Sequence, residues 1–146
     1  MHEMNRRIDM HTCRQHHEAL RILLDRFPES LPLDAADFSK LVSRLSTLLL
    51  THLKLEDDLL YPALELSEDR TVRDTAIRYR QEMGGLKDAF MKFVSTWGTE
   101  DAIAANQAGC LDAWLKVRAA LEVRMAKEDH GLYSIADDHL SRDETA

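Results

Sequence analysis

An all-α fold, an up-down-up-down antiparallel four-helix bundle, is what the sequence predicts, and three observations carry the prediction. Four segments repeat apolar residues at steps of three and four, the spacing of one helix face. Turn formers are scarce: the 146 residues include five glycines and three prolines, too few for the many short strands of an all-β protein. Leu, Ala, Glu, Arg and Lys are abundant, and these residues favour helices.

The first two expected helices are bounded by prolines and aspartates. The apolar seam of the first spans about residues 9–27, and Pro28 ends it because proline cannot continue a helix. The second begins at Asp34 or Asp37, since either side chain can cap the free N–H groups of a first turn. Pro62, near its end, lacks a backbone donor and is expected to kink or close the last turn.

The third expected helix spans about residues 71–97, and Gly98 closes it. Gly84 and Gly85 interrupt its seam, and each costs about 1 kcal/mol relative to Ala in a helix interior. Such a pair favours a bend in the helix or a close approach of a neighbouring helix.

The fourth expected helix begins at Glu100 or Ala105 and ends near Ser134. The polar tail that follows, residues 137–146, is expected to fray. The connections between the helices are short, which makes neighbouring helices antiparallel. We therefore expect residues 1–146 to form a single domain without a linker, with one continuous core at about residues 9–136.

Composition argues against several classes of partner. The net charge is −7 and the basic residues are scattered among acids, so no nucleic-acid partner is expected. The longest apolar run, residues 48–50, is far too short to span a bilayer, and the polar residues 1–9 lack the apolar core of a signal peptide. Cys13 and Cys110 form no Cys-x-x-Cys pair and are expected to be reduced thiols. These features predict a cytoplasmic protein without a membrane partner.

Polar residues interrupt the apolar seams on three of the four helices. They lie on or beside the expected inner face: His17, His52, Glu56, Arg124 and Glu128. Buried charge is costly unless it is paired or bound to a metal, so these positions call for a shared explanation. His52 and Glu56 are four residues apart, which places an imidazole and a carboxylate one turn apart on the same helix face.

Three stretches of the chain resemble a known family. Residues 51–64, which read THLKLEDDLLYPAL, resemble the second helix of hemerythrin-like (HHE cation-binding) domains, where a His, a Glu four residues later and an aromatic-Pro-x-Leu ending recur together. Residues 14–24 and 121–133 resemble the first and last helices of that family. The resemblance covers nearly the whole chain in order and spacing. It implies a hemerythrin-like bundle around a non-haem metal site, with oxygen or nitric-oxide sensing or iron handling as the role.

The resemblance also implies a set of metal ligands, and this chain retains part of it. His17 matches the histidine of the family's first helix, with the adjacent His16 as the alternative, although the steps of three and four favour His17. His52 and Glu56 match the second-helix pair. Glu128 matches a carboxylate of the last helix. These four residues, His17, His52, Glu56 and Glu128, are the expected metal ligands.

Other positions depart from the family pattern. The third helix of the family supplies one or two histidines, whereas this third helix has none and offers Tyr79 and Met83 in its seam. Met83 is expected to pack in the core, with a thioether ligand as the alternative. Tyr79 is expected to lie in the seam with its hydroxyl hydrogen-bonded to a neighbour, and the alternative is that it binds ferric iron as a phenolate ligand. Arg124 stands where the last helix should carry a histidine, beside a retained Asp129 that is expected to line the site.

Arg124 suggests how a reduced site would be balanced. A guanidinium stays protonated and cannot bind a metal, but it can donate two hydrogen bonds to a carboxylate. We expect Arg124 to pair with Glu56 and Glu128 and to replace the charge of one metal ion. A second cation beside it would be repelled by about 4 kcal/mol at 4 Å and an effective dielectric of 20.

Two functional hypotheses follow. The first is a protein with a reduced non-haem site, holding iron or a similar metal as one ion rather than two, that senses oxygen or nitric oxide or handles iron. The second is a regulatory or protein-interaction module that has kept the fold without any metal. The sequence shows no nucleophile-base pair, so an enzyme is not expected. The expected partner is a small diatomic ligand in the first case and a regulatory protein in the second.

Overall fold

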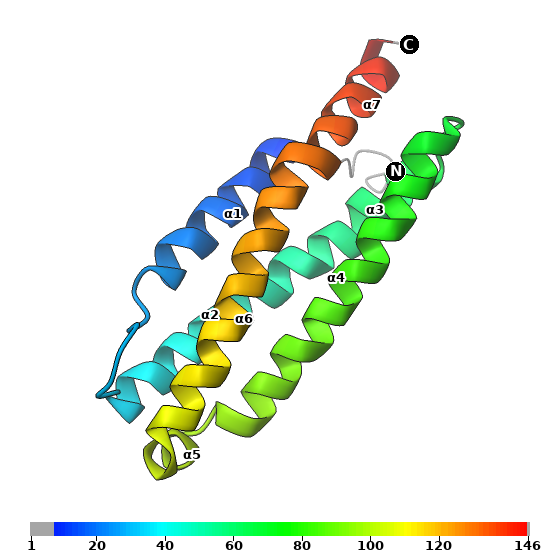
Figure 1. Cartoon of the computed structure of the whole chain (residues 1–146). Helices are drawn as coiled ribbons and strands as arrows, with labels where there is room; N and C mark the ends of the chain where they lie inside the picture. The colour runs from blue at the N-terminus through cyan, green and yellow to red at the C-terminus, as the bar shows by residue number, and fades with distance from the viewer. Residues whose placement is uncertain (1–7, 146) are drawn as a thin grey trace.

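The computed structural model describes the backbone of residues 8–145 and the side chains of residues 8–140. The elements are α1 (Met10–Leu24), α2 (Ala35–Leu55), η2 (Glu56–Leu60), α3 (Tyr61–Glu65), α4 (Arg70–Trp97), α5 (Glu100–Ala105), α6 (Gln107–Lys127), η3 (Glu128–Leu132) and α7 (Tyr133–Thr145). Four rods lie along one another: α1, α2 continued by α3, α4, and α6 continued by α7 (Figure 1). The described residues contain no strand. The predicted all-α bundle is therefore confirmed.

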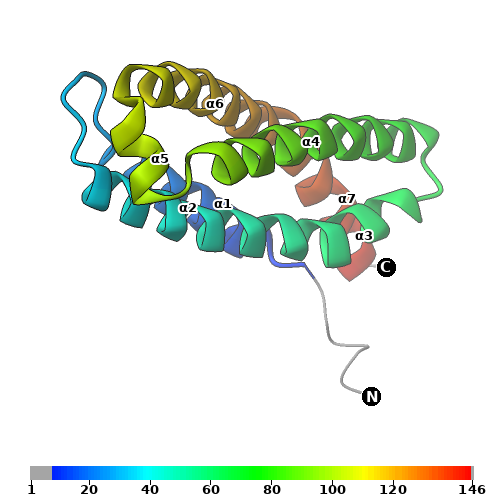
Figure 2. The same cartoon turned by 90° about the horizontal axis from the view of Figure 1, so that it is seen from below.

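Helix starts follow the capping chemistry of the sequence. Of the two predicted caps of α2, Asp34 is the one used, since its side chain accepts a hydrogen bond from the Asp37 N–H at 3.0 Å. Gly98 caps the end of α4, as expected. The fourth predicted segment starts at residue 100 but breaks at Asn106, so the short helix α5 precedes α6 at one end of the bundle (Figure 2).

Pro62 does not end the second rod. The helix widens into the π-segment η2 and continues as α3 to Glu65. A proline clashes with the carbonyl four residues before it and lacks an N–H. In the π-segment directly before Pro62, the Tyr61 N–H donates to the carbonyl of Glu56, five residues back, so the helix passes the proline with a wider turn.

The last rod is longer than expected. It passes through the π-segment η3 and runs on to Thr145 as α7, so the predicted helix end near Ser134 is wrong, and residues 137–145, which were expected to fray, are helical in the structure. Arg14 of α1 donates two hydrogen bonds to Asp137, at 3.2 and 2.6 Å, and ties the start of α7 to the bundle. Residues 1–7, where no signal peptide is expected, and Ala146 lie outside the described residues.

The buried apolar side chains form two clusters, one toward each end of the bundle. The larger contains Trp114, Phe27 and Phe38, and the smaller contains Tyr61 and Tyr133. The rods that carry His17, His52, Glu56 and Glu128 each contribute to both clusters, one cluster on either side of these polar residues. The flanking apolar residues are Leu20 and Cys13 in α1, Leu49 and Leu60 around η2, and Met125 and Leu132 around η3. The polar residues therefore lie between two apolar cores. None of the described helices is long and apolar enough to cross a membrane.

The glycine pair of α4 is not explained by close packing. A Cβ placed on Gly84 or Gly85 would meet nothing within 4 Å, so the expected close helix approach is absent at both positions. Gly84→Ala and Gly85→Ala are each expected to stabilise the protein by about 0.5–1 kcal/mol, because Ala loses less backbone entropy. Urea unfolding measures this change, and the exposed Ala89→Gly of the same helix should show the opposite sign. Loss of stability in the alanine variants would show that α4 needs a glycine conformation.

Candidate metal centre

Four buried donors from three rods meet between the two apolar clusters. His17 comes from α1, His52 from α2, and Glu56 and Glu128 open the two π-segments. Donor atoms of all four lie within 4.8 Å of one another, and no residue of the four is more than 1% exposed. The structure thus brings together the whole ligand set that the sequence suggested.

The distances between the donors match those around a single ion. The Nε2 atom of His17 lies 3.1 Å from Nε2 of His52 and 3.1 Å from Oε1 of Glu128, and Nε2 of His52 lies 3.4 Å from Oε2 of Glu56. Neighbouring donors bound at about 2.1 Å are separated by about 3.0 Å in an octahedron and by about 3.4 Å in a tetrahedron. The site can therefore take one ion without large rearrangement.

An unpartnered oxygen supports a cation at this position. Glu56 is fully buried, yet its Oε1 atom has no hydrogen-bond partner in the described part of the chain. A buried carboxylate oxygen without a partner costs free energy, and buried polar atoms are rarely left so. Its lone pairs are available to a metal ion, so the residues present fit a bound cation.

The two carboxylates are unequal in the protein alone. Burial raises the pKa of Glu128 well above its usual range, and the nearby charge of Glu56 raises it further. Burial also acts to raise the pKa of Glu56, but the hydrogen bond and charge of His52 outweigh it and hold that pKa below its usual value. Glu128 therefore holds a proton more tightly than Glu56, and a bound cation would compete with that proton.

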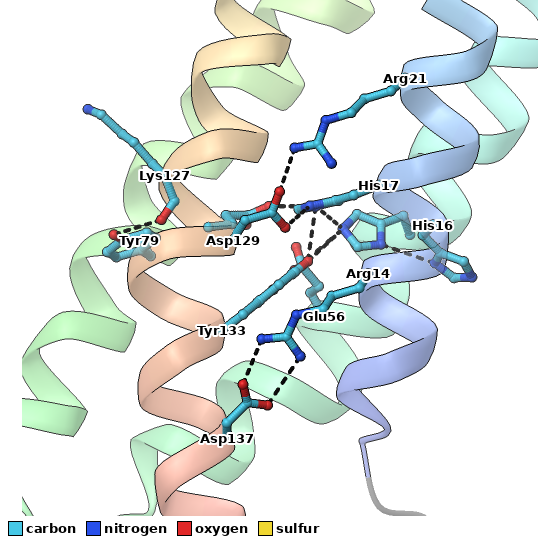
Figure 3. Close-up of polar contacts among 12 residues, drawn as sticks. Arg14, His16, His17, Arg21, Glu56, Tyr79, Lys127, Asp129, Tyr133 and Asp137 are labelled. Atoms are coloured by element: carbon cyan, nitrogen blue, oxygen red, sulfur yellow. Dashed lines mark hydrogen bonds and ion pairs between the residues drawn. The ribbon is translucent and has the colours of Figure 1, made fainter.

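His17 is held in place by a chain of polar contacts from outside the donor set. Its Nδ1 atom lies 2.8 Å from Oδ1 of Asp129, and Arg21 donates to the other oxygen of that carboxylate (Figure 3). This contact fixes the ring so that Nε2 faces the other donors, as is usual for metal-binding histidines. Burial lowers the pKa of His17, which favours the neutral form that binds metals. Asp129 thus lies beside the site as a support for His17.

His16 supports the other imidazole. It is half-buried, and its Nδ1 atom lies 3.1 Å from Nδ1 of His52, on the side of the ring that faces away from the donors. His17, not His16, is therefore the inward residue of α1, as the helical spacing favoured. The exposed His130 faces away from the cluster.

Comparison with known protein families assigns the fold. A family model described as the hemerythrin HHE cation binding domain matches residues 9–136. The chain belongs to the hemerythrin HHE cation-binding family. The resemblance seen in the three helical stretches is confirmed by this match. No curated protein and no solved structure matches the chain significantly.

Two positions that depart from the hemerythrin pattern do not supply donors. The Tyr79 hydroxyl donates to the Lys127 carbonyl at 3.3 Å and packs against the backbone of Gly131, so the structure does not bring it to the cluster (Figure 3). Met83 is buried and packs in the larger apolar cluster. Both residues take the packing role that the sequence favoured for them.

Arg124 does not replace the metal charge. Its Nη2 atom pairs with Oε2 of Glu82 at 2.6 Å, and its guanidinium lies over the Tyr79 ring. The predicted pairing with Glu56 and Glu128 is therefore wrong. The Arg124 side chain is only 11% exposed, so its charge stays largely within the protein, and the half-exposed Glu82 on α4 is the carboxylate that compensates it.

Tyr133 is a buried member of the site that sequence reasoning missed. Its hydroxyl donates to Oε2 of Glu56 at 2.6 Å and lies 3.0 and 3.2 Å from the Nε2 atoms of His17 and His52. On a regular α-helix, a residue five positions after Glu128 faces away from it. The π-segment brings Tyr133 back, since its N–H donates to the Glu128 carbonyl. The available signal is a repeat: Leu-Tyr follows each site glutamate at the same spacing, as in Leu60-Tyr61.

A small apolar cavity adjoins the donors on the side of the larger cluster. Its volume is about 10 Å³, room for about one water-sized molecule. Besides His17, His52 and Glu128, its walls are mostly leucine and methionine side chains, with Arg124 at one side. Leu53 and Met83 also line a surface pocket of about 500 Å³ between α2 and α4. These two side chains therefore separate the donors' cavity from the outside.

Proposed function

We propose that this hemerythrin-family protein binds one non-haem iron ion and presents it to a small diatomic ligand, oxygen or nitric oxide. The observation that carries the proposal is the convergence of the donor atoms of His17, His52, Glu56 and Glu128 within 4.8 Å of one another, and the Glu56 oxygen without a partner supports it. Imidazole and carboxylate donors suit iron, although manganese and zinc accept them too.

One ion is favoured over two by the residues on the cavity side. Met83 and Arg124 line the cavity next to Glu128, where further histidines would be needed to hold a second ion. Arg124 binds no metal, and its positive charge repels a second cation.

The cavity supports a diatomic ligand. A bound ferrous ion supplies an open coordination position and the electrons that hold oxygen or nitric oxide. The protein contributes an apolar space with room for about one water-sized molecule, and this space excludes larger substrates. We therefore propose a binding role and no catalysis. The full burial of the four donors favours a retained ion, and hence sensing over iron handling.

The metal-free alternative loses its main support. It depends on Arg124 neutralising Glu56 and Glu128, and Arg124 instead pairs with Glu82. A metal-free module would then keep two buried carboxylates close together, which costs stability and gives neither of them a role.

The test is to load the chelator-treated protein with ferrous iron without oxygen and to add nitric oxide. Electron paramagnetic resonance should show one iron-nitrosyl signal per chain in the wild type. His52→Ala should lose the signal, while His130→Ala, a change at an exposed histidine, should keep it. An equal signal from the His52 variant would contradict the proposed site.

Met83 is expected to control the rate at which the ligand arrives. Met83→Ala removes part of the wall between the surface pocket and the cavity, so nitric oxide should bind several-fold faster in stopped-flow measurements. Met91→Ala, at a more exposed methionine of the same helix, should leave the rate unchanged. An unchanged rate in Met83→Ala would place the entry route elsewhere.

A further inference from the structure

We infer that the phenol oxygen of Tyr133 becomes a fifth ligand of the metal ion when the bound iron is ferric. The inference rests on the proposed metal site and adds a residue that neither the sequence pattern nor the His/Glu cluster contains.

The position of the Tyr133 phenol oxygen supports coordination. It lies 2.6 Å from Oε2 of Glu56 and 3.0 and 3.2 Å from Nε2 of His17 and His52. The last two distances are those between neighbouring donors of one ion, about 3.0–3.4 Å for bonds of about 2.1 Å. Figure 3 shows the Tyr133 ring reaching in from α7 until its hydroxyl lies among the site residues. The oxygen thus lies where it can become a neighbouring donor of the same ion once its hydrogen bond to Glu56, which is shorter than a donor–donor separation, is broken.

The hydrogen bonds of the phenol change once an ion is bound. An imidazole whose Nε2 binds a metal has no hydrogen on that nitrogen, and its lone pair is directed at the ion, so it can no longer hydrogen-bond Tyr133. The contacts at 3.0 and 3.2 Å then place the phenol oxygen beside two metal-bound nitrogens, within reach of the ion.

Tyr61 can be compared with Tyr133 within the same molecule. Tyr61 follows Glu56 at the same spacing as Tyr133 follows Glu128, and both tyrosines are fully buried. The hydroxyl of Tyr61 reaches only Oε2 of Glu128, at 3.5 Å, among the described residues. The two π-segments match, but only Tyr133 extends into the donor set.

The charge balance links this coordination to the ferric state. Coordination breaks the O–H bond of Tyr133 and forms a metal–oxygen bond, and the proton leaves to solvent. Glu56, Glu128 and the Tyr133 phenolate then carry three negative charges, which a ferric ion neutralises. A divalent ion is already balanced by the two carboxylates, so with ferrous iron or zinc the phenol keeps its proton and its hydrogen bond to Glu56.

The test adds ferric citrate to chelator-treated protein, with zinc in a parallel sample, and removes unbound metal by gel filtration. Ferric wild type should show the visible charge-transfer band of a phenolate on iron, and zinc protein should show none. Tyr133→Phe should bind iron without this band and should lose about tenfold or more of its ferric-over-zinc preference. Tyr61→Phe, the matched control, should keep both.

The other possible outcomes contradict either the ligand role of Tyr133 or the metal site itself. Wild type that binds iron at these residues but stays colourless would overturn the ligand role of Tyr133 and leave the proposed metal site intact. A band that persists in Tyr133→Phe and disappears in Tyr61→Phe would assign the role to Tyr61. Wild type that binds no metal would overturn both proposals. The wild-type spectrum alone, with tyrosinate modes in its resonance Raman signal, decides the matter even where the variant fails to fold.

Discussion

Replacing Glu128 with Gln is expected to stabilise the metal-free protein and to weaken metal binding about 100-fold or more. Gln has nearly the shape of Glu but carries no charge, so it removes the cost of a second buried acid beside Glu56. It also removes an anionic donor, which the bound ion needs. Unfolding of chelator-treated protein and competition with a metal indicator measure the two effects. A variant that is more stable without metal but binds metal more weakly shows that Glu128 serves metal binding and not folding.

The stability gain should depend on pH in a defined direction. The pKa of Glu128 is raised in the folded protein above the ordinary value of 4.5. The contribution of Glu128 to stability is therefore fully present below pH 4.5 and is lost as the pH rises toward the folded pKa. The advantage of Glu128→Gln should be near zero at pH 4 and should grow above it, by at most about 1.4 kcal/mol per pH unit.

A second glutamate gives a control of opposite sign. The hydrogen bond from Arg124 lowers the pKa of the exposed Glu82, so its contribution to stability is present above pH 4.5 and is lost as the pH falls. Glu82→Gln should therefore slightly destabilise the protein at neutral pH. If Glu128→Gln also destabilised the metal-free protein at pH 7, Glu128 would have to be paired more favourably than the structure indicates.

A double substitution should raise the metal content from one ion per chain to two. Met83→His with Arg124→His places two imidazoles on the wall of the cavity next to Glu128 and removes the cation that opposes a second ion. The free Oε1 of Glu56 can then serve the new ion. Elemental analysis by mass spectrometry measures the content after reconstitution with ferrous iron.

Single variants serve as controls for this change. Arg124→His alone and Met83→His alone should stay near one ion per chain, since one added imidazole leaves the second ion poorly held. One ion per chain in the double variant would show that these two positions do not share a site with Glu128.

The fold and four of the site residues could be predicted because they follow the regular helix period. His17, His52, Glu56 and Glu128 interrupt apolar seams at steps that a 3.6-residue repeat preserves. Tyr133 could not be found this way, because the π-segment adds a residue to the turn and rotates everything after it. The same irregularity let the second helix continue past Pro62.

Arg124 shows a different limit of the sequence. Its position in the seam was predicted, and its Cα does lie on a helix beside the site. A side chain this long can reach several partners, and helical period does not say which one it takes. Glu82 lies on the neighbouring helix α4, and no spacing along the chain connects it to Arg124.

The most direct test of the central claim is the metal content of untagged protein purified without added metal, then stripped and reloaded with ferrous iron. Mass spectrometry should find about one ion per chain in the wild type and almost none in a His52→Ala, Glu128→Gln double variant that remains helical. Wild type without metal after reloading, or equal contents in the two proteins, would contradict a metal site at His17, His52, Glu56 and Glu128.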